Sequence, residues 1–127
     1  MKILVVEDEN NLQLVLKYNL ELDGNEVLLA DNGQECLDLV DDSIDLILMD
    51  VMMPVMHGID ACKQLKGDPK TQNIPVFMLT AKSQINDIEA AFQAGANDYL
   101  TKPFEPAELA ERIQSKLAKY RGSKKDG

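Results

Sequence analysis

The sequence is poor in several features that mark large classes of protein. Its 127 residues include two cysteines, one histidine and no tryptophan, and neither Cys36 nor Cys62 has a second cysteine or a histidine at the spacing of a zinc site. No apolar run approaches the roughly 20 residues that a membrane-spanning helix needs, and the first residues lack the basic, apolar and small-residue regions of a signal peptide. We therefore expect buried free cysteines, no membrane insertion and a cytoplasmic location.

Positive charge is scarce as well. The 13 lysines and arginines against 22 aspartates and glutamates leave a net charge of −9 and an isoelectric point near 4.5, which opposes direct binding to nucleic-acid phosphates. The remaining composition, 45% hydrophobic and 28% charged, is that of one globular domain. We expect this domain over residues 1–120, followed by a disordered polar tail over residues 121–127.

Five short apolar runs recur along the chain at regular spacing. Each is too short for a helix and is continuous rather than alternating, which is typical of strands covered on both faces of a parallel sheet. The runs lie at residues 3–6, 27–29, 46–49, 76–79 and 99–100. They predict five buried parallel strands.

Helical patterns fill the intervals between these runs. Apolar residues three or four apart predict helices with one buried face. Three stripes are clear: Leu12, Val15, Leu16 and Leu20; Ile85, Ile88 and Phe92; Leu109, Ile113 and Leu117. Gly24 and Gly95 are placed to end helices, and Pro106 to begin one. Ser83 is placed to cap the fourth helix, and Phe104 to pack on the last stripe.

The alternation of strands and helices predicts the architecture. A (βα)5 chain whose crossovers are right-handed folds into an α/β three-layer sandwich around a doubly wound, five-stranded parallel sheet. By analogy with flavodoxin-like sheets, we expect the strand order 2-1-3-4-5.

Polar residues follow four of the five predicted strands directly. Glu7 and Asp8 come after the first, Asp50 after the third, Thr80 after the fourth and Lys102 after the fifth. In open α/β sheets the ligand crevice lies beyond the carboxyl ends of the strands. The order of strands would therefore bring three carboxylates, a hydroxyl and an ammonium together in one pocket.

Three crowded carboxylates repel one another, and a hard divalent cation relieves that repulsion. Oxygen ligands without cysteine or a suitable histidine favour Mg²⁺ over zinc. A carboxylate can also attack phosphorus to form an aspartyl-phosphate. We therefore predict that Asp50 is the phosphoacceptor, with Lys102, Thr80 and the metal each binding one phosphoryl oxygen.

These residues resemble a known family, the receiver domains of response regulators in two-component signalling, and in particular single-domain receivers of the chemotaxis-regulator kind. The resemblance covers residue 2 to about residue 120. It rests on four motifs in order: VVED at residues 5–8, MDVMMPVMHG at 49–58, LTA at 79–81 and DYLTKPF at 98–104. Glutamate at position 7, where many relatives carry aspartate, is a variant of the pattern.

The resemblance implies a partner and a metal site. Asp50 would receive its phosphoryl group from a histidine kinase or phosphotransfer protein, and the domain would catalyse only its own phosphorylation and dephosphorylation. Asp8, Asp50 and the backbone carbonyl of Met52 would bind Mg²⁺, and Glu7 would act mainly through a metal-bound water. The downstream target would be a protein, reached by a monomer or by a phosphorylation-dependent dimer.

The resemblance also implies a switch. Thr80 would move toward the phosphoryl group while Tyr99 turns inward, which would remodel the surface formed by the fourth helix, fifth strand and fifth helix. An aromatic residue at position 99 also fits simple packing. The bond between Lys102 and Pro103 is expected to be cis, as it usually is in the family.

Two other functions remain open from the sequence. A degenerate receiver would bind partners without being phosphorylated, although the full residue set is present here. A phosphatase acting through an aspartyl-phosphate would want a second aspartate where Met52 stands. Nucleotide binding is disfavoured because the sequence has no Walker motif or glycine-rich dinucleotide loop.

Overall fold

The computed structural model of the chain describes residues 1–53, 55–81, 87–102 and 105–126, with residues 106 and 120–126 described by their backbone. Over these described residues, five strands alternate with five helices. They are β1 (Lys2–Val6), α1 (Asn10–Leu22), β2 (Glu26–Ala30), α2 (Gly33–Leu39), β3 (Leu46–Asp50), α3 (Gly58–Gly67), β4 (Val76–Ala81), α4 (Asp87–Gln93), β5 (Asp98–Lys102) and α5 (Pro106–Asp126).

The strands form one parallel sheet in the order β2-β1-β3-β4-β5. This confirms the predicted strands, the predicted order and the flavodoxin-like fold. Strand β3, at the centre, is buried along its whole length, which explains why its sequence is a continuous apolar run rather than an alternating one.

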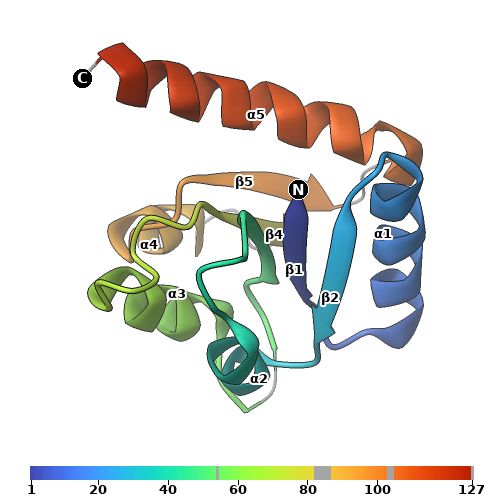
Figure 1. The fold of residues 1–127 in the computed structure, drawn as a ribbon. Helices are drawn as coiled ribbons and strands as arrows, with labels where there is room; N and C mark the ends of the chain where they lie inside the picture. The colour runs from blue at the N-terminus through green and yellow to red at the C-terminus, as the bar shows by residue number, and fades with distance from the viewer. Residues whose placement is uncertain (54, 82–86, 103–104, 127) are drawn as a thin grey trace.

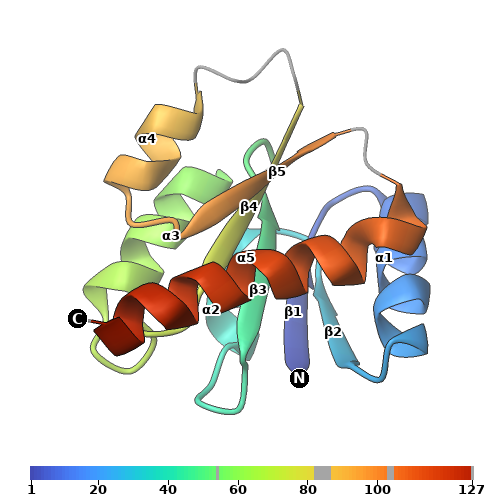
Figure 2. The ribbon, with the colours of Figure 1, turned by 90° about the horizontal axis from the view of Figure 1, so that it is seen from above.

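Helices cover both faces of the sheet (Figures 1 and 2). Helices α1 and α5 pack on one face, which we call the α1/α5 face, and α2, α3 and α4 on the other, the α2–α4 face. Each face has its own core: Leu16, Leu20 and Ile113 lie in the first, Cys62 and Ala91 in the second. Because the strands are parallel, their carboxyl ends lie along one edge of the sheet, between the two layers of helices.

The predicted helix stripes are confirmed in part. Leu109, Ile113 and Leu117 are all buried. In α1, however, Val15 is 39% exposed and the buried residues are Gln13, Leu16 and Leu20. Leu16 and Leu20 are buried as predicted and Leu12 packs against the same core, so the placing of Val15 on the buried face was wrong and the rest of the stripe was right. Gln13 is buried as well and finds hydrogen-bond partners inside the fold.

Phe92 of α4 is 44% exposed, and Ala91 takes the buried position beside it. Gly24 (φ +88°) and Gly95 (φ +102°) follow α1 and α4 in the left-handed conformation, and α5 begins at Pro106. These placements confirm the predicted helix boundaries. Ser83 lies outside the described residues.

Helix α5 runs to Asp126, through the positions expected to form a disordered tail, while the domain boundary at residue 120 stays a prediction. Both cysteines are buried and free, as expected. Among the described residues, no helix is long and apolar enough to cross a membrane. The predicted Phe104 packing and the cis bond to Pro103 fall outside the described residues.

Candidate functional site

Three carboxylates meet at the carboxyl edge of the sheet. Glu7 and Asp8 follow β1, and Asp50 ends β3, the strand paired with β1. Each offers one oxygen atom within 4.8 Å of the others. Glu7 is 1% exposed and Asp50 6%, whereas Asp8 is exposed. The predicted cluster therefore forms, with two acids buried and one facing solvent.

Lys102 closes this cluster from β5. Its ammonium nitrogen lies 2.9 Å from Asp50 Oδ2 and 3.2 Å from Glu7 Oε2. The three residues are far apart in sequence and meet because β1, β3 and β5 end at the same edge of the parallel sheet. The structure thus places the predicted lysine in direct contact with the predicted phosphoacceptor.

Burial and charged neighbours change the pKa values of Glu7 and Lys102. Burial, followed by the hydrogen bond and negative charge of Asp50, raises the pKa of Glu7 to about 7, although the Lys102 ammonium acts in the opposite direction. Burial alone would lower the pKa of Lys102, but Asp50 and Glu7 outweigh it and leave that pKa raised. One ammonium does not balance three acids, so the site retains excess negative charge.

This donor set fits a hard cation. All of its members offer carboxylate oxygens, the ligands that Mg²⁺ and Ca²⁺ prefer, and a cation would relieve the repulsion between them. Glu7, Asp8 and Asp50 could therefore hold a metal ion.

The loop between β3 and α3 is tied to Asp50. The backbone N–H of Met52 donates to Asp50 Oδ1 at 3.0 Å, and the N–H of Gly58 donates to the carbonyl of Val51 at 3.0 Å. A Cβ atom at Gly58 would overlap the carbonyl oxygen of Asp50. Glycine is therefore required there for close approach of α3 to the site. The role of the Met52 carbonyl as a metal ligand stays a prediction.

Gln13, which was not among the residues expected at the site, supports it from α1. Its side-chain amide donates to Asp31 Oδ1 at 2.7 Å and also to the backbone carbonyl of Glu7. Gln13 is 5% exposed and so ties the end of β1, which carries the acids, to the loop after β2. Its position three and seven residues before two buried leucines of α1 was the available signal: a polar side chain on an apolar helix face needs internal partners.

The two predicted switch residues lie beyond the acid cluster. Thr80 is fully buried near the end of β4, beside the strand that carries Asp50, and its hydroxyl donates to the carbonyl of Ala81 at 3.3 Å. Tyr99 of β5 is half-buried against the core of the α2–α4 face. Its ring meets that of Phe92 edge to face, with centroids 6.1 Å apart. Their movement on phosphorylation stays a prediction.

Comparison with known proteins agrees with this geometry. A family model described as the response regulator receiver domain matches residues 3–114. The chain is 47% identical to the transcriptional regulatory protein CpxR of Escherichia coli (strain K12) over 116 residues, which are 91% of this chain and 49% of the relative. The chain spans about half the length of the first curated relatives it matches.

Solved structures give the same result over nearly the whole chain. A response regulator receiver domain protein of Clostridium thermocellum has a TM-score of 0.82 and 32% identity, covering 94% of this chain and 96% of that one. The receiver domain of a sensor histidine kinase of Pseudomonas aeruginosa PAO1, with a magnesium ion coordinated in its active site cleft, has a TM-score of 0.81 and 34% identity, covering 92% and 97%. With the fold, the strand-end residues and the family model in agreement, the chain belongs to the response regulator receiver domains of two-component signalling.

Proposed function

We propose that this chain is a phosphorylation-dependent switch that accepts a phosphoryl group on Asp50 from a histidine kinase or a phosphotransfer protein. The observation that carries the proposal is the setting of Asp50. The Asp50 side chain is 8% exposed, lies 2.9 Å from the Lys102 ammonium and shares the site with two further acids. This is the arrangement that a carboxylate nucleophile and a charged phosphoryl group both need.

The Asp50 carboxylate would act as the nucleophile. One of its oxygens forms a bond to phosphorus while the bond from phosphorus to the donor's imidazole nitrogen breaks, and the imidazole leaves with that electron pair. Lys102 is placed to pair with one phosphoryl oxygen. Thr80, on the neighbouring strand, would donate its hydroxyl to another. No external substrate would be turned over.

We propose Mg²⁺ as the metal, bound by Asp8, Asp50 and the backbone carbonyl of Met52, with Glu7 acting through water. When bound, Mg²⁺ supplies positive charge to the phosphoryl oxygens. The magnesium ion in the Pseudomonas receiver domain supports this choice by similarity. The chain's own contribution is to hold the acids in place before the donor arrives.

An exposed apolar stripe beside the site supports a protein as donor. Leu14, Tyr18 and Leu22, four residues apart along α1, are 60%, 65% and 68% exposed. Helix α1 begins two residues after Asp8, and the stripe begins one turn into the helix, toward the end that follows the acid cluster. A phosphodonor protein that presents its phosphohistidine to Asp50 would cover these side chains, since exposed apolar patches of this kind mark contact surfaces.

The proposal is tested by intact mass measurement after incubation with acetyl phosphate and Mg²⁺. We expect one phosphoryl adduct on the wild type, none on Asp50→Asn, and none when EDTA removes the metal. Asp42→Asn, which changes an exposed aspartate away from the site, should be labelled like the wild type.

Failure of the wild type to form an adduct, under conditions that label a known receiver, would contradict the proposal and favour the degenerate receiver. Steady release of phosphate from a phosphomonoester would instead indicate the phosphatase.

A further inference from the structure

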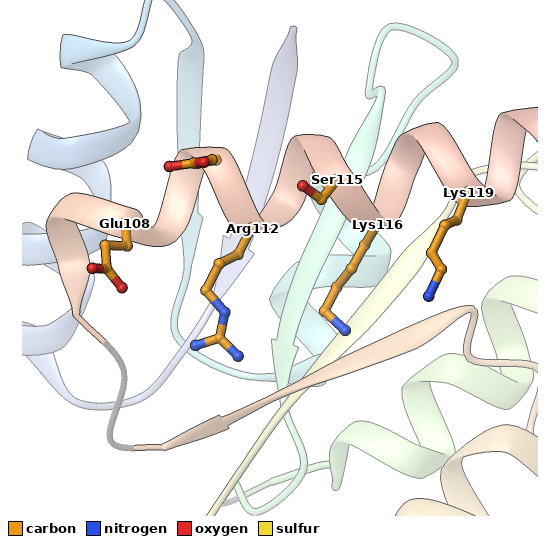
Figure 3. Close-up of a pocket in the computed structure, with 6 residues that line it drawn as sticks. Glu108, Arg112, Ser115, Lys116 and Lys119 are labelled. Atoms are coloured by element: carbon orange, nitrogen blue, oxygen red, sulfur yellow. The ribbon is translucent and has the colours of Figure 1, made fainter.

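Helix α5 carries a row of charged side chains along the side that faces β5. Figure 3 shows Arg112, Lys116 and Lys119 extending from α5 toward the strand. With three other residues of the helix they line a groove of about 530 Å³. One of the lining residues, Lys116, contacts Tyr99 of β5.

Lys116 makes two contacts that converge on Tyr99. Its ammonium nitrogen lies 5.5 Å from the centroid of the Tyr99 ring, within the range of a cation–π interaction. The same nitrogen donates to Asp98 Oδ1 at 3.0 Å, and that oxygen also accepts the backbone N–H of Tyr99 at 2.8 Å. The ammonium is therefore fixed relative to both the ring and the backbone of one residue.

Contacts from two helices hold the Tyr99 ring. Phe92 of α4 meets it edge to face, with an angle of 83° between the ring planes, and Lys116 of α5 lies over it. Phe92 is 44% exposed and the Lys116 side chain 26%, so neither contact is locked in a core. Such contacts can be broken without unfolding the domain.

We infer that Lys116 is a positioning residue for the switch: it holds Tyr99 in the orientation that the unphosphorylated domain adopts. The inference rests on the proposed function, because it treats Tyr99 as part of the response to phosphorylation. Loss of a partly exposed cation–π contact should change the balance between two ring orientations about two- to fivefold. The Lys116 contact would then set how much phosphorylation is needed to move the ring.

The first experiment observes the ring without phosphorylation. The chain has three tyrosines, so protein labelled with 3-fluorotyrosine gives three ¹⁹F resonances, and Tyr99→Phe identifies one of them. Lys116→Met keeps most of the side chain but removes the charge, and it should move the Tyr99 resonance by more than its linewidth. Lys116→Arg should restore the wild-type position, whereas Lys119→Met, one turn further along α5, should not move it.

A Tyr99 resonance that stays in place in Lys116→Met would overturn the inference. Equal shifts in Lys116→Met and Lys119→Met would also overturn the inference, since they would report a general effect of charge on α5.

The second experiment measures phosphorylation. The acetyl phosphate concentration that labels half of the protein should fall about two- to fivefold in Lys116→Met and return toward the wild-type value in Lys116→Arg. An unchanged concentration, with wild-type protein that is labelled normally, would overturn the regulatory role. If no wild-type protein is labelled, the proposed function fails, and the fluorine spectra alone decide whether Lys116 positions Tyr99.

Discussion

The cores on the two faces of the sheet differ in amino-acid composition. The core of the α1/α5 face consists of leucine, isoleucine, valine and one phenylalanine, packed under helices of 13 and 21 residues. The core of the α2–α4 face includes three methionines, two cysteines and five alanines, packed under helices of 7, 10 and 7 residues. Small and unbranched side chains fill space with less specific packing than branched ones.

This difference in packing predicts which face of the sheet stays fixed and which face rearranges. Tyr99 packs against the core of the α2–α4 face, so the residue expected to move sits on the side with shorter helices and softer packing. Regions that rearrange in proteins are drawn from those with lower local stability. We therefore expect the α1/α5 face to hold the fold and the α2–α4 face to absorb the movement.

Adjacent residues of β3 test this contrast most strongly. Leu48 and Met49 are both fully buried, on the α1/α5 and α2–α4 faces respectively. We expect Leu48→Ala to lower the free energy of unfolding by about 4 kcal/mol and Met49→Ala by about 2 kcal/mol, since a softer surrounding closes more of the cavity. Urea denaturation measures both changes. Equal losses would remove the contrast.

The acid cluster, where the two faces meet, should oppose folding in the absence of metal. The pKa of Glu7 is raised from 4.5 to about 7, so the folded state favours the protonated carboxyl. The stability that this shift contributes is fully present below pH 4.5 and is lost as the pH rises through 7. We expect metal-free protein to lose about 2 kcal/mol of unfolding free energy between pH 5 and pH 8.

Urea denaturation in EDTA at several pH values measures the slope of the unfolding free energy against pH. Glu7→Gln should remove most of it, while Glu111→Gln, an exposed carboxylate on α5, should keep it. A slope that survives in Glu7→Gln would mean that other groups carry the effect.

The smallest expected effect lies in the loop after β3. Among the described residues other than glycine, Val55 alone has a positive φ, 69°, which a β-branched residue adopts at a cost. Its side chain is 82% exposed, so little packing offsets that cost. Val55→Asn should raise the free energy of unfolding by about 0.5–1 kcal/mol. Val15→Asn, at another exposed valine, should give no such gain.

The fold could be predicted from sequence because buried parallel strands are continuous apolar runs, of which β3 is the clearest. The cluster of Glu7, Asp8, Asp50 and Lys102 followed from one rule, that strand ends share an edge. Strand order came from analogy, since no property of a single run such as residues 46–49 specifies its neighbours in the sheet.

Contacts that depend on how a helix faces the sheet were not predicted. The apolar pattern of α1 placed Val15 inside, whereas Val15 is partly exposed and Gln13 is buried with hydrogen-bond partners inside the fold. The meeting of Lys116 with Tyr99 likewise depends on how α5 lies across β5, which spacing along the helix does not determine. The positive φ of Val55 results from loop closure and leaves no pattern in the sequence.

The two buried cysteines make the opening of the α2–α4 face measurable by thiol modification. Burial raises the pKa of Cys36 to about 12 and that of Cys62 to about 11, so neither thiol reacts as a thiolate while the native fold is closed. Both lie in the core of the α2–α4 face, in α2 and α3. The rate at which a thiol-specific reagent modifies Cys36 and Cys62 therefore measures how often this face opens at α2 and at α3, and no engineered cysteine is needed.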